Sequence, residues 1–269
     1  MLYLSSLLQT NKTYKPAADK LSAALDLFYI NYKYINNKKD IWLRDFMPVK
    51  SRGSRFVSFR YEPQYLKGYS YLRTDFRNEI SPLIALPGLV YSDINLDGGN
   101  VVFLPSKDKA IISDRVFSEN PEYKKTKLIA ELENLLRAQI TIIPSLPMKY
   151  DMTGHADGMI RFVDENTVIG NRINSINSLE QNIKSVLSQN NISVIDFPYF
   201  ESRGKSAVGC YLNFLETENV IFLPVFNVKM DNEALSVAQS LYSKEIYPVN
   251  INEIAKSGGV LNCISWEWQ

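Results

Sequence analysis

The strongest constraint on the fold is a pattern of elements that recurs at intervals of roughly 54 residues. Between residues 97 and 250 the chain repeats one order three times: two β-rich runs joined by a turn, an amphipathic helix, and a third β-rich run. The first expected helix has Asn120 as its N-cap and Pro121 at its first position, and the others begin near Asn177 and Asn232. Self-similarity of this kind is typical of units arranged around an axis or along a solenoid.

The expected strands of these units are short runs rich in Val, Ile and Phe. The paired runs before the helices are VVFLP with AIIS, MIRFV with TVIGN, and CYLNFLE with VIFLPVF; the runs after them are ITIIP, ISVIDFP and IYPVN.

Two further units are expected outside this stretch. In the first, DFMPV and RFVSFRY would be strands, LRTDFRNEI a weak helix and LIALPG the last strand. The other would be split, with CISWEW at the C-terminus as its first strand and the N-terminal LYLSS, PAADKLSAALDLFYI and YKYI as the rest. Because a split unit brings the termini together, we predict one domain over residues 1–269, a closed five-unit α/β propeller. A generic α/β protein with alternating elements is the alternative.

Reactive side chains recur at or just before the first strand of several units. They are Asp45, Asp97, His155 and Cys263, at steps of 52, 58 and 108 residues, and the skipped position falls near Gly209. In a ring, the equivalent ends of these strands converge on the axis. We therefore expect two carboxylates, an imidazole and a thiol to meet in one central site.

The only histidine of the chain lies in GHADGMIRF. An extended backbone would turn His155 and Asp157 to the same face, because side chains alternate along a strand. Gly154 and Gly158 permit close approach of the backbone to a ligand. The alternative is a buried core histidine followed by a turn aspartate.

The other candidates also have structural alternatives. Asp97 is followed by two glycines, which is typical of a hairpin turn. In IWLRDFMPV an extended backbone would put Trp42 and Arg44 on one face, and Arg44 with Asp45 could be a surface pair. A buried structural role is the commonest one for a free cysteine. We assign that role to Cys210, which lies within the expected strand CYLNFLE.

Composition excludes some classes of function. The 30 basic and 29 acidic residues are balanced and scattered, which argues against nucleic acid or a membrane as the main partner. Two cysteines are too few for a disulfide framework, and the N-terminus is a poor secretory signal. No apolar run approaches the roughly 18 residues that a membrane span needs. We expect a cytoplasmic protein, and a homodimer is left open.

Five motifs occur in order between Trp42 and Cys263: W-x-R-D, D-G-G-N, G-H-x-D-x-x-x-R-F, Y-x-N-F and G-G-x-x-x-C. This order resembles the agmatine deiminase family, which includes the Porphyromonas-type peptidylarginine deiminases. The resemblance implies the pentein fold, a five-bladed pseudo-symmetric α/β propeller of ββαβ units. The chain departs from the family at Asp97, which is most often Glu, and at Asn262, where many members have His. These departures bear on the substrate more than on the chemistry.

The resemblance also implies a reaction, the hydrolysis of a guanidinium to a ureido group and ammonia. Asp45 and Asp157 would hold the guanidinium by charge-assisted hydrogen bonds. Cys263 would attack its carbon as a thiolate, and His155 would protonate the ammonia and then activate water. Asp97 would hold or tune His155. Further contacts to the substrate are implied for Trp42, Arg44, Asn100, Arg161 and Asn213.

Agmatine, converted to N-carbamoylputrescine, is the first-choice substrate, and peptidylarginine or free arginine is the runner-up. An amidinotransferase, a catalytically silent guanidino-ligand binder and a Cys–His–Asp amidase remain alternatives. The chemistry requires no metal or organic cofactor, and one histidine with two distant cysteines gives no tetrahedral zinc pattern. The expected partner is a small guanidino compound.

Overall fold

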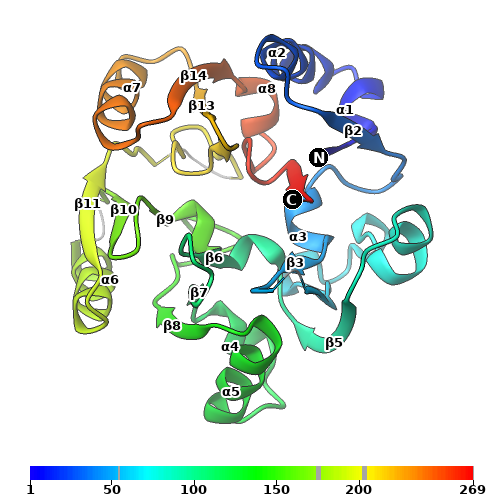
Figure 1. The fold of residues 1–269 in the computed structure, drawn as a ribbon, viewed down its shortest axis with the longest axis vertical. Coiled ribbons are helices and arrows are strands. Elements are labelled where there is room, and N and C mark those ends of the chain that lie inside the picture. Colours follow the sequence, from blue (N-terminus) through cyan, green and yellow to red (C-terminus); the bar gives the residue numbers. More distant parts are fainter. Residues whose placement is uncertain (54, 174–176, 202–204, 269) are drawn as a thin grey trace.

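The computed structural model describes residues 1–53, 55–173, 177–201 and 205–268. Within these residues, five three-stranded sheets surround a common axis, like the blades of a propeller (Figure 1). In every blade the first strand runs antiparallel to the second, and the third runs parallel to it. The blades are β15 (Ser265–Glu267), β1 (Leu2–Ser5) and β2 (Tyr32–Ile35); β3 (Val49–Lys50), β4 (Phe56–Arg60) and β5 (Leu89–Asn95); β6 (Val101–Phe103), β7 (Lys109–Ser113) and β8 (Gln139–Ile143); β9 (Ile160–Phe162), β10 (Thr167–Asn171) and β11 (Ser193–Phe197); and β12 (Leu215–Glu216), β13 (Val220–Val225) and β14 (Glu245–Asn250). The predicted propeller of repeated units is confirmed.

Parallel second and third strands need a crossover, and a helix on the outer rim usually supplies it (Figure 1). These crossover helices are α2 (Lys15–Leu27), α5 (Lys125–Leu136), α6 (Asn177–Gln189) and α7 (Met230–Leu241). The shorter helical segments are α1 (Leu7–Thr10), α3 (Leu43–Phe46), α4 (Arg115–Glu119), α8 (Asn252–Ala255), η1 (Gln64–Leu66), η2 (Ser70–Leu72), η3 (Phe76–Ile80), η4 (Ser81–Leu83), η5 (Gly98–Asn100) and η6 (Ala156–Gly158). Among the helices with described positions, none has the length and apolar character that a bilayer crossing requires.

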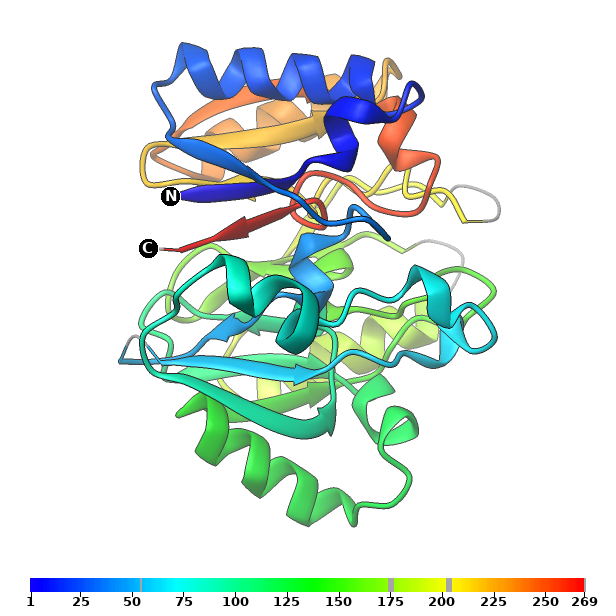
Figure 2. The same cartoon turned by 90° about the vertical axis from the view of Figure 1, so that its right-hand side faces the viewer.

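The two ends of the chain build one blade, as the split unit predicts. β1 pairs antiparallel with β15, with Tyr3 opposite Trp266, and it pairs parallel with β2. The N-terminal ammonium of Met1 donates to the carbonyl oxygen of Trp268 at 3.0 Å. Figure 2 shows the two termini side by side on one face of the molecule. We call this blade the terminal blade.

The predicted start of the crossover helix α5 is wrong. α5 begins at Lys125, and Asn120 does not cap it. The buried Asn120 amide instead accepts from the backbone N–H of Asn95 at 2.8 Å and donates to the carbonyl oxygens of Asn95 and Val116. Its side chain therefore joins β5 to α4 and is not available to a helix N-terminus.

Three predicted strands are also wrong. DFMPV begins in the helical turn α3, and only Val49–Lys50 of that region pairs as β3. LIALPG forms no strand, and the third strand of the blade that begins with β3 is β5. The weak helix expected over LRTDFRNEI is reduced to the short turn η3. In CYLNFLE only Leu215–Glu216 pairs, so Cys210 does not lie in a strand.

Candidate active site

Short turns at the inner ends of the blades carry the candidate residues. Asp45 lies on α3, Asp97 directly precedes η5, and His155 directly precedes η6. Cys263 lies in the turn before β15, and Asn213 in the turn before β12. Asn213 therefore fills the equivalent position of the blade that begins with β12, which the spacing predicts near Gly209. The expectation of an extended backbone from His155 to Asp157 is wrong, because the residues after His155 form the helical turn η6.

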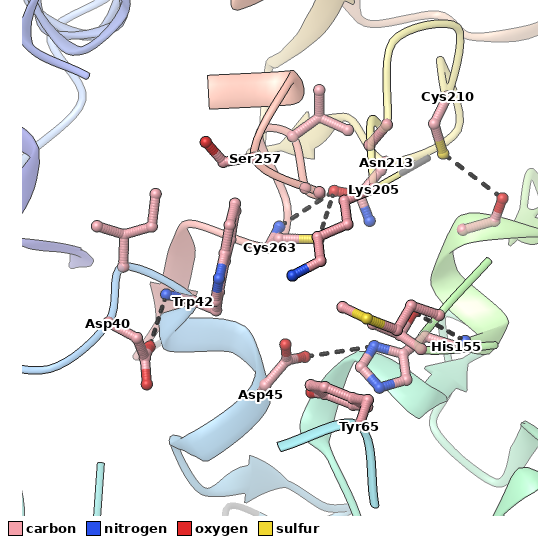
Figure 3. Close-up of a pocket in the computed structure, with 18 of the residues that line it drawn as sticks. Asp40, Trp42, Asp45, Tyr65, His155, Lys205, Cys210, Asn213, Ser257 and Cys263 are labelled. Carbon is pink, nitrogen blue, oxygen red and sulfur yellow. Dashed lines mark hydrogen bonds and ion pairs between the residues drawn. The ribbon is translucent and has the colours of Figure 1, made fainter. Parts of the chain in front are cut away.

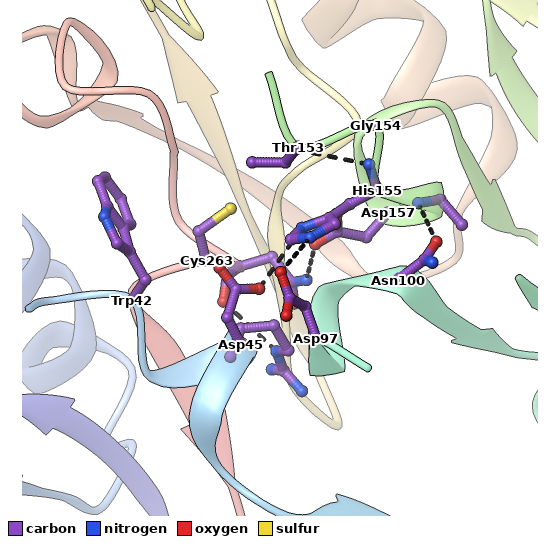
Figure 4. A network of polar contacts seen from close by, with 12 residues as sticks. Trp42, Asp45, Asp97, Asn100, Thr153, Gly154, His155, Asp157 and Cys263 are labelled. Atoms are coloured by element: carbon purple, nitrogen blue, oxygen red, sulfur yellow. Dashed lines mark hydrogen bonds and ion pairs between the residues drawn. The ribbon is translucent and has the colours of Figure 1, made fainter. Parts of the chain in front are cut away.

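Three of these turns meet around one backbone position, Gly99 of η5. A Cβ atom placed on Gly99 would lie 2.7 Å from Asp45 Oδ1, 3.0 Å from His155 Nδ1 and 3.4 Å from Asp157 Oδ2. The three side chains come from α3, from the residue before η6 and from η6 itself, and Figure 4 shows them pointing toward one another. Asp45 and His155, two of the four residues expected to converge, therefore lie together here, and Asp157 lies with them.

His155 is buried between two carboxylates. Its Nε2 lies 2.8 Å from Asp97 Oδ2, and its Nδ1 lies 3.5 Å from Asp45 Oδ1. The hydroxyl of Tyr65 donates to the same Oδ2 of Asp97 at 2.8 Å. Burial alone would lower the pKa of His155, but the carboxylates of Asp45 and Asp97 outweigh it and raise that pKa to about 10. The field of these carboxylates therefore favours the imidazolium form of the ring. Burial also raises the pKa of Asp45 well above its usual range.

A second network holds the thiol beside Asp157. Asp157 Oδ2 accepts from the side-chain amides of Asn213 at 2.7 Å and Asn262 at 2.6 Å. The side-chain oxygen Oδ1 of Asn213 in turn accepts from the backbone N–H of Cys263 at 3.1 Å and from its thiol at 3.0 Å. Sequence reasoning assigned no role to Asn262 or Tyr65. The only signal for Asn262 was its place directly before the thiol, where many family members have His.

The environment of Cys263 favours the neutral thiol. Burial raises the pKa of Cys263 well above its usual value, and the negative charges of Asp157 and Asp45 raise it further. A cation bound between these carboxylates would act in the opposite direction. The arrangement therefore couples the ionisation of the thiol to the presence of a positively charged ligand.

A cavity of about 490 Å³ gives a ligand access to these groups. Asp45, His155, Asp157, Asn213 and Cys263 all line it, together with aromatic side chains that include Trp42, Tyr65, Tyr150 and Tyr199. Figure 3 shows Asp45, His155 and Cys263 around this cavity. Asp45 Oδ1 is buried and makes no hydrogen bond within the described part of the chain. In the same part, no three His, Cys, Asp or Glu side chains are grouped so that they could hold a metal ion.

Three residues expected to contact the substrate do not line this cavity. The amide oxygen of Asn100 accepts from the backbone N–H groups of Ser113 and Ala156, at 3.0 and 3.2 Å, so it joins β7 to η6. The guanidinium carbon of Arg161 lies 4.4 Å from the Phe214 ring centroid, and its Nη2 lies 3.5 Å from Oε2 of Glu216. Arg44 lines a different cavity, described below. The motif positions predicted these contacts, but the side chains are directed elsewhere.

Cys210 lies closer to the candidate site than its expected place in a strand would allow. It lines the same cavity as Cys263, and its thiol donates to the carbonyl oxygen of Gly158 at 3.5 Å. Burial raises the pKa of the Cys210 thiol, followed by the charge of Asp157. The chain thus presents two thiols to one cavity, and they differ in their partners.

Comparisons with known proteins agree with this fold. The model of the Porphyromonas-type peptidyl-arginine deiminase family matches residues 6–268. Agmatine deiminase of Enterococcus faecalis is similar with 15% identity and a TM-score of 0.76, over 98% of this chain and 92% of that chain. C. jejuni agmatine deiminase with substrate bound has 18% identity and a TM-score of 0.70, over 98% and 92%. DDAH from Pseudomonas aeruginosa complexed with citrulline has 12% identity and a TM-score of 0.61, over 98% and 97%.

No curated protein sequence matches the chain. At identities below 20% the solved structures show a shared fold, whereas the family model covers nearly the whole chain. The chain therefore belongs to the Porphyromonas-type peptidyl-arginine deiminases, a family of guanidino-modifying hydrolases with the pentein fold.

Proposed function

We propose that the protein hydrolyses the guanidinium group of a small compound to a ureido group and ammonia, through a covalent thiouronium intermediate on Cys263. One observation carries this proposal: the Cys263 thiol, the His155 imidazolium and the carboxylates of Asp45 and Asp157 line one cavity. A nucleophile, an acid and two anionic acceptors are the groups that this reaction needs.

The two carboxylates supply the binding site for the cation. Asp45 Oδ1 has His155 Nδ1 at 3.5 Å as an ion-pair partner but accepts no hydrogen bond in the described chain, so it can accept one from a guanidinium N–H. Asp157 is held in place by two amides that both donate to its Oδ2. Paired carboxylates bind a planar guanidinium through charge-assisted hydrogen bonds. Binding would also remove the repulsion that two buried carboxylates impose on each other.

The bound cation would activate the nucleophile. Its positive charge offsets Asp45 and Asp157, lowers the pKa of Cys263 and releases the thiol proton to water. The thiolate attacks the guanidinium carbon, and the resulting tetrahedral centre expels ammonia with a proton from His155. Neutral His155 then removes a proton from a water molecule that attacks the thiouronium. The C–S bond breaks, and the ureido product leaves with Cys263 restored.

Agmatine is our first choice of substrate, with N-carbamoylputrescine as the product. A cavity of about 490 Å³ is within the size range of small-molecule sites. Solved structures that share the fold include agmatine deiminases. Free arginine and peptidylarginine are the alternatives, since each carries the same guanidinium on a different tail.

A substrate panel tests the proposal. Purified protein is incubated with agmatine, arginine, arginine-containing peptides and methylated arginines, and ammonia and ureido product are both measured. We expect both products in equal amounts from at least one member, with agmatine the best, and none with the Cys263→Ala variant. Release of ammonia by that variant, or no turnover of any member by wild-type protein, would refute the proposal.

A further inference from the structure

A second cavity, of about 260 Å³, lies along the first strands of three blades. Its charged lining residues are Arg44, Lys50, Lys107 and Glu267, and its apolar walls include Met47, Val101, Phe103 and Trp266. Lys50 lies on β3 and Glu267 on β15. Figure 2 shows β15 running from the loop that precedes it to the face where the termini lie. We call this cavity the rear cavity, because it lies along the strands that lead away from the catalytic turns.

The charges of the rear cavity are only partly compensated. Three cations and one carboxylate line it, and all four side chains are half-buried. Within the described ranges, none of the four forms an ion pair within 4.0 Å. Burial and then the charge of Lys50 lower the pKa of Lys107 to about 8, against the opposing attraction of Glu267. The positive charges around Lys107 therefore outweigh the one carboxylate. Charged groups removed from water are normally paired with opposite charges. The three cations of the rear cavity have only one carboxylate among them.

The hydrogen-bond donors of these cations are largely unused. The Lys107 ammonium donates to the carbonyl oxygen of Lys50 at 3.2 Å, and Arg44 Nε donates to the carbonyl oxygen of Asn262 at 3.4 Å. Among the described residues no side-chain or backbone acceptor takes a hydrogen bond from the two Nη atoms of Arg44 or from the Lys50 ammonium. The free side of a guanidinium is suited to a bidentate oxyanion, and an ammonium adds a point charge.

We propose that the rear cavity binds a small oxyanion, with Arg44 as the bidentate donor and Lys50 and Lys107 as the supporting charges. The shared chemistry is that of a phosphate or a carboxylate, and Glu267 weakens the site by repelling either. The proposal goes beyond the deiminase reaction, because none of these side chains lines the catalytic cavity. It also explains why Arg44, next to Asp45 in the motif, points away from the proposed substrate.

Calorimetric titration of the full chain tests the proposal. Inorganic phosphate and acetate are titrated separately at constant ionic strength, with chloride as the blank, so that the two oxyanion sources are distinguished. We expect saturable one-to-one binding of at least one oxyanion to wild-type protein. The Lys50→Gln/Lys107→Gln variant should bind about tenfold or more weakly, since each lost charged donor weakens an anion site. Glu267→Gln should bind more tightly.

Matched variants separate a local site from the overall charge. Lys124→Gln/Lys127→Gln removes two exposed positive charges at α5, and Glu245→Gln removes one exposed negative charge on β14. Both lie outside the rear cavity, and both variants should bind as wild type does. If the Lys50→Gln/Lys107→Gln variant does not fold, Lys107→Gln alone and Glu267→Gln must still shift the affinity in opposite directions. Absent binding to wild type, or Glu267→Gln and Glu245→Gln changing affinity equally, would overturn the proposal. Because no turnover is measured, its failure is distinct from failure of the proposed reaction.

Discussion

Cys263 and His155 have pKa values shifted in the same direction for different physical reasons. Burial and neighbouring carboxylates keep the Cys263 thiol neutral, whereas the carboxylates keep His155 charged despite its burial. The free protein therefore holds a thiol and an imidazolium, and one proton must leave before the thiol can react. A bound cation offsets the field of Asp45 and Asp157 and so lowers the pKa of Cys263. It also removes part of the field that raises the pKa of His155, where the hydrogen bond to Asp97 remains. At the scale of residues, the site is set to react when a cation occupies it.

Removing the thiol of Cys263 and removing the imidazole of His155 should block different steps of the reaction. Cys263→Ala leaves no nucleophile, so no covalent adduct can form, but Asp45 and Asp157 remain and the substrate should still bind. His155→Ala keeps the thiol and loses the acid and base, which should cost roughly 10²–10⁴-fold in rate. Mass spectrometry of each variant after mixing with substrate gives the measurement, and circular dichroism checks folding. An adduct on Cys263→Ala, or wild-type turnover by His155→Ala, would show that the roles are misassigned.

The carboxylate of Asp97 should set the alkaline limit of the reaction. Asp45 and then Asp97 raise the pKa of His155 to about 10, so Asp97→Asn should lower that pKa and move the alkaline limb of kcat/KM to lower pH. The raised pKa of His155 also makes the stability of the fold depend on pH, with a loss on the alkaline side. A raised histidine pKa stabilises the fold below about pH 6.5, and this stabilisation is lost as pH rises through about 10. In Asp97→Asn the loss should occur at lower pH. An alkaline limb identical to that of wild type would contradict this account.

The two thiols of the cavity should react differently with a cationic reagent. A haloacetamidine carries the charge that Asp45 and Asp157 bind, so it should alkylate Cys263. Cys210 bonds to the carbonyl oxygen of Gly158, and burial keeps its pKa high. We predict that Cys210→Ser keeps most of the activity and is labelled as fast as wild type. Peptide mapping of the alkylated protein locates the label, and a label on Cys210 would overturn the assignment.

At the scale of elements, the long crossover helices and most strands could be predicted from the sequence, but the catalytic turns could not. α6 and α7 begin within about two residues of their predicted starts, because apolar spacing over several turns is a strong signal. α3, η5 and η6 have only three or four residues, which is too short for periodicity to register. The repeat spacing still located the residues they carry. The directions of Arg44, Asn100 and Arg161 depend on local packing that no motif encodes.

A substitution at Gly99 tests whether catalysis needs the close approach of η5 to Asp45 and His155. A methyl group there would lie 2.7 Å from Asp45 Oδ1 and 3.0 Å from His155 Nδ1, so η5 or these side chains must shift. Misplacing catalytic groups by about 1 Å can cost 10²-fold, and we expect Gly99→Ala to lose about that in kcat/KM. Gly158→Ala on η6 is the matched control, because its nearest neighbours lie at 3.9 and 4.0 Å. Steady-state kinetics give kcat/KM for both variants. Equal losses of kcat/KM would show that the close packing around Gly99 is not what the reaction needs.

At the scale of the whole molecule, the site depends on closure of the ring by the chain ends. Cys263 lies just before β15, and β15 is held by β1 of the terminal blade. One buried cluster then joins this blade to its neighbour: Trp266 and Tyr3 pack with Phe56 of β4 and with Leu43 of α3, the helix that carries Asp45. The nucleophile and a carboxylate from the opposite end of the sequence therefore share one support.

Trp266 is the residue that tests this closure. Its ring centroid lies 5.5 Å from that of Tyr3 and 5.9 Å from that of Phe56, and its indole N–H donates to the carbonyl oxygen of Pro48 at 2.8 Å. Trp266→Ala would open a cavity between two blades and leave that carbonyl unpaired. We expect the free energy of unfolding to fall by about 3–5 kcal/mol, measured by chemical denaturation.

Trp268→Ala is the matched control for ring closure, because Trp268 is only half-buried and follows β15 directly. It should cost clearly less stability than Trp266→Ala and should leave turnover close to wild type. Trp266→Ala should also lower kcat under conditions where the variant is still folded, because β15 and α3 would lose their common support. A Trp266→Ala protein with full activity, or one no less stable than Trp268→Ala, would show that the blades hold the site without a closed ring.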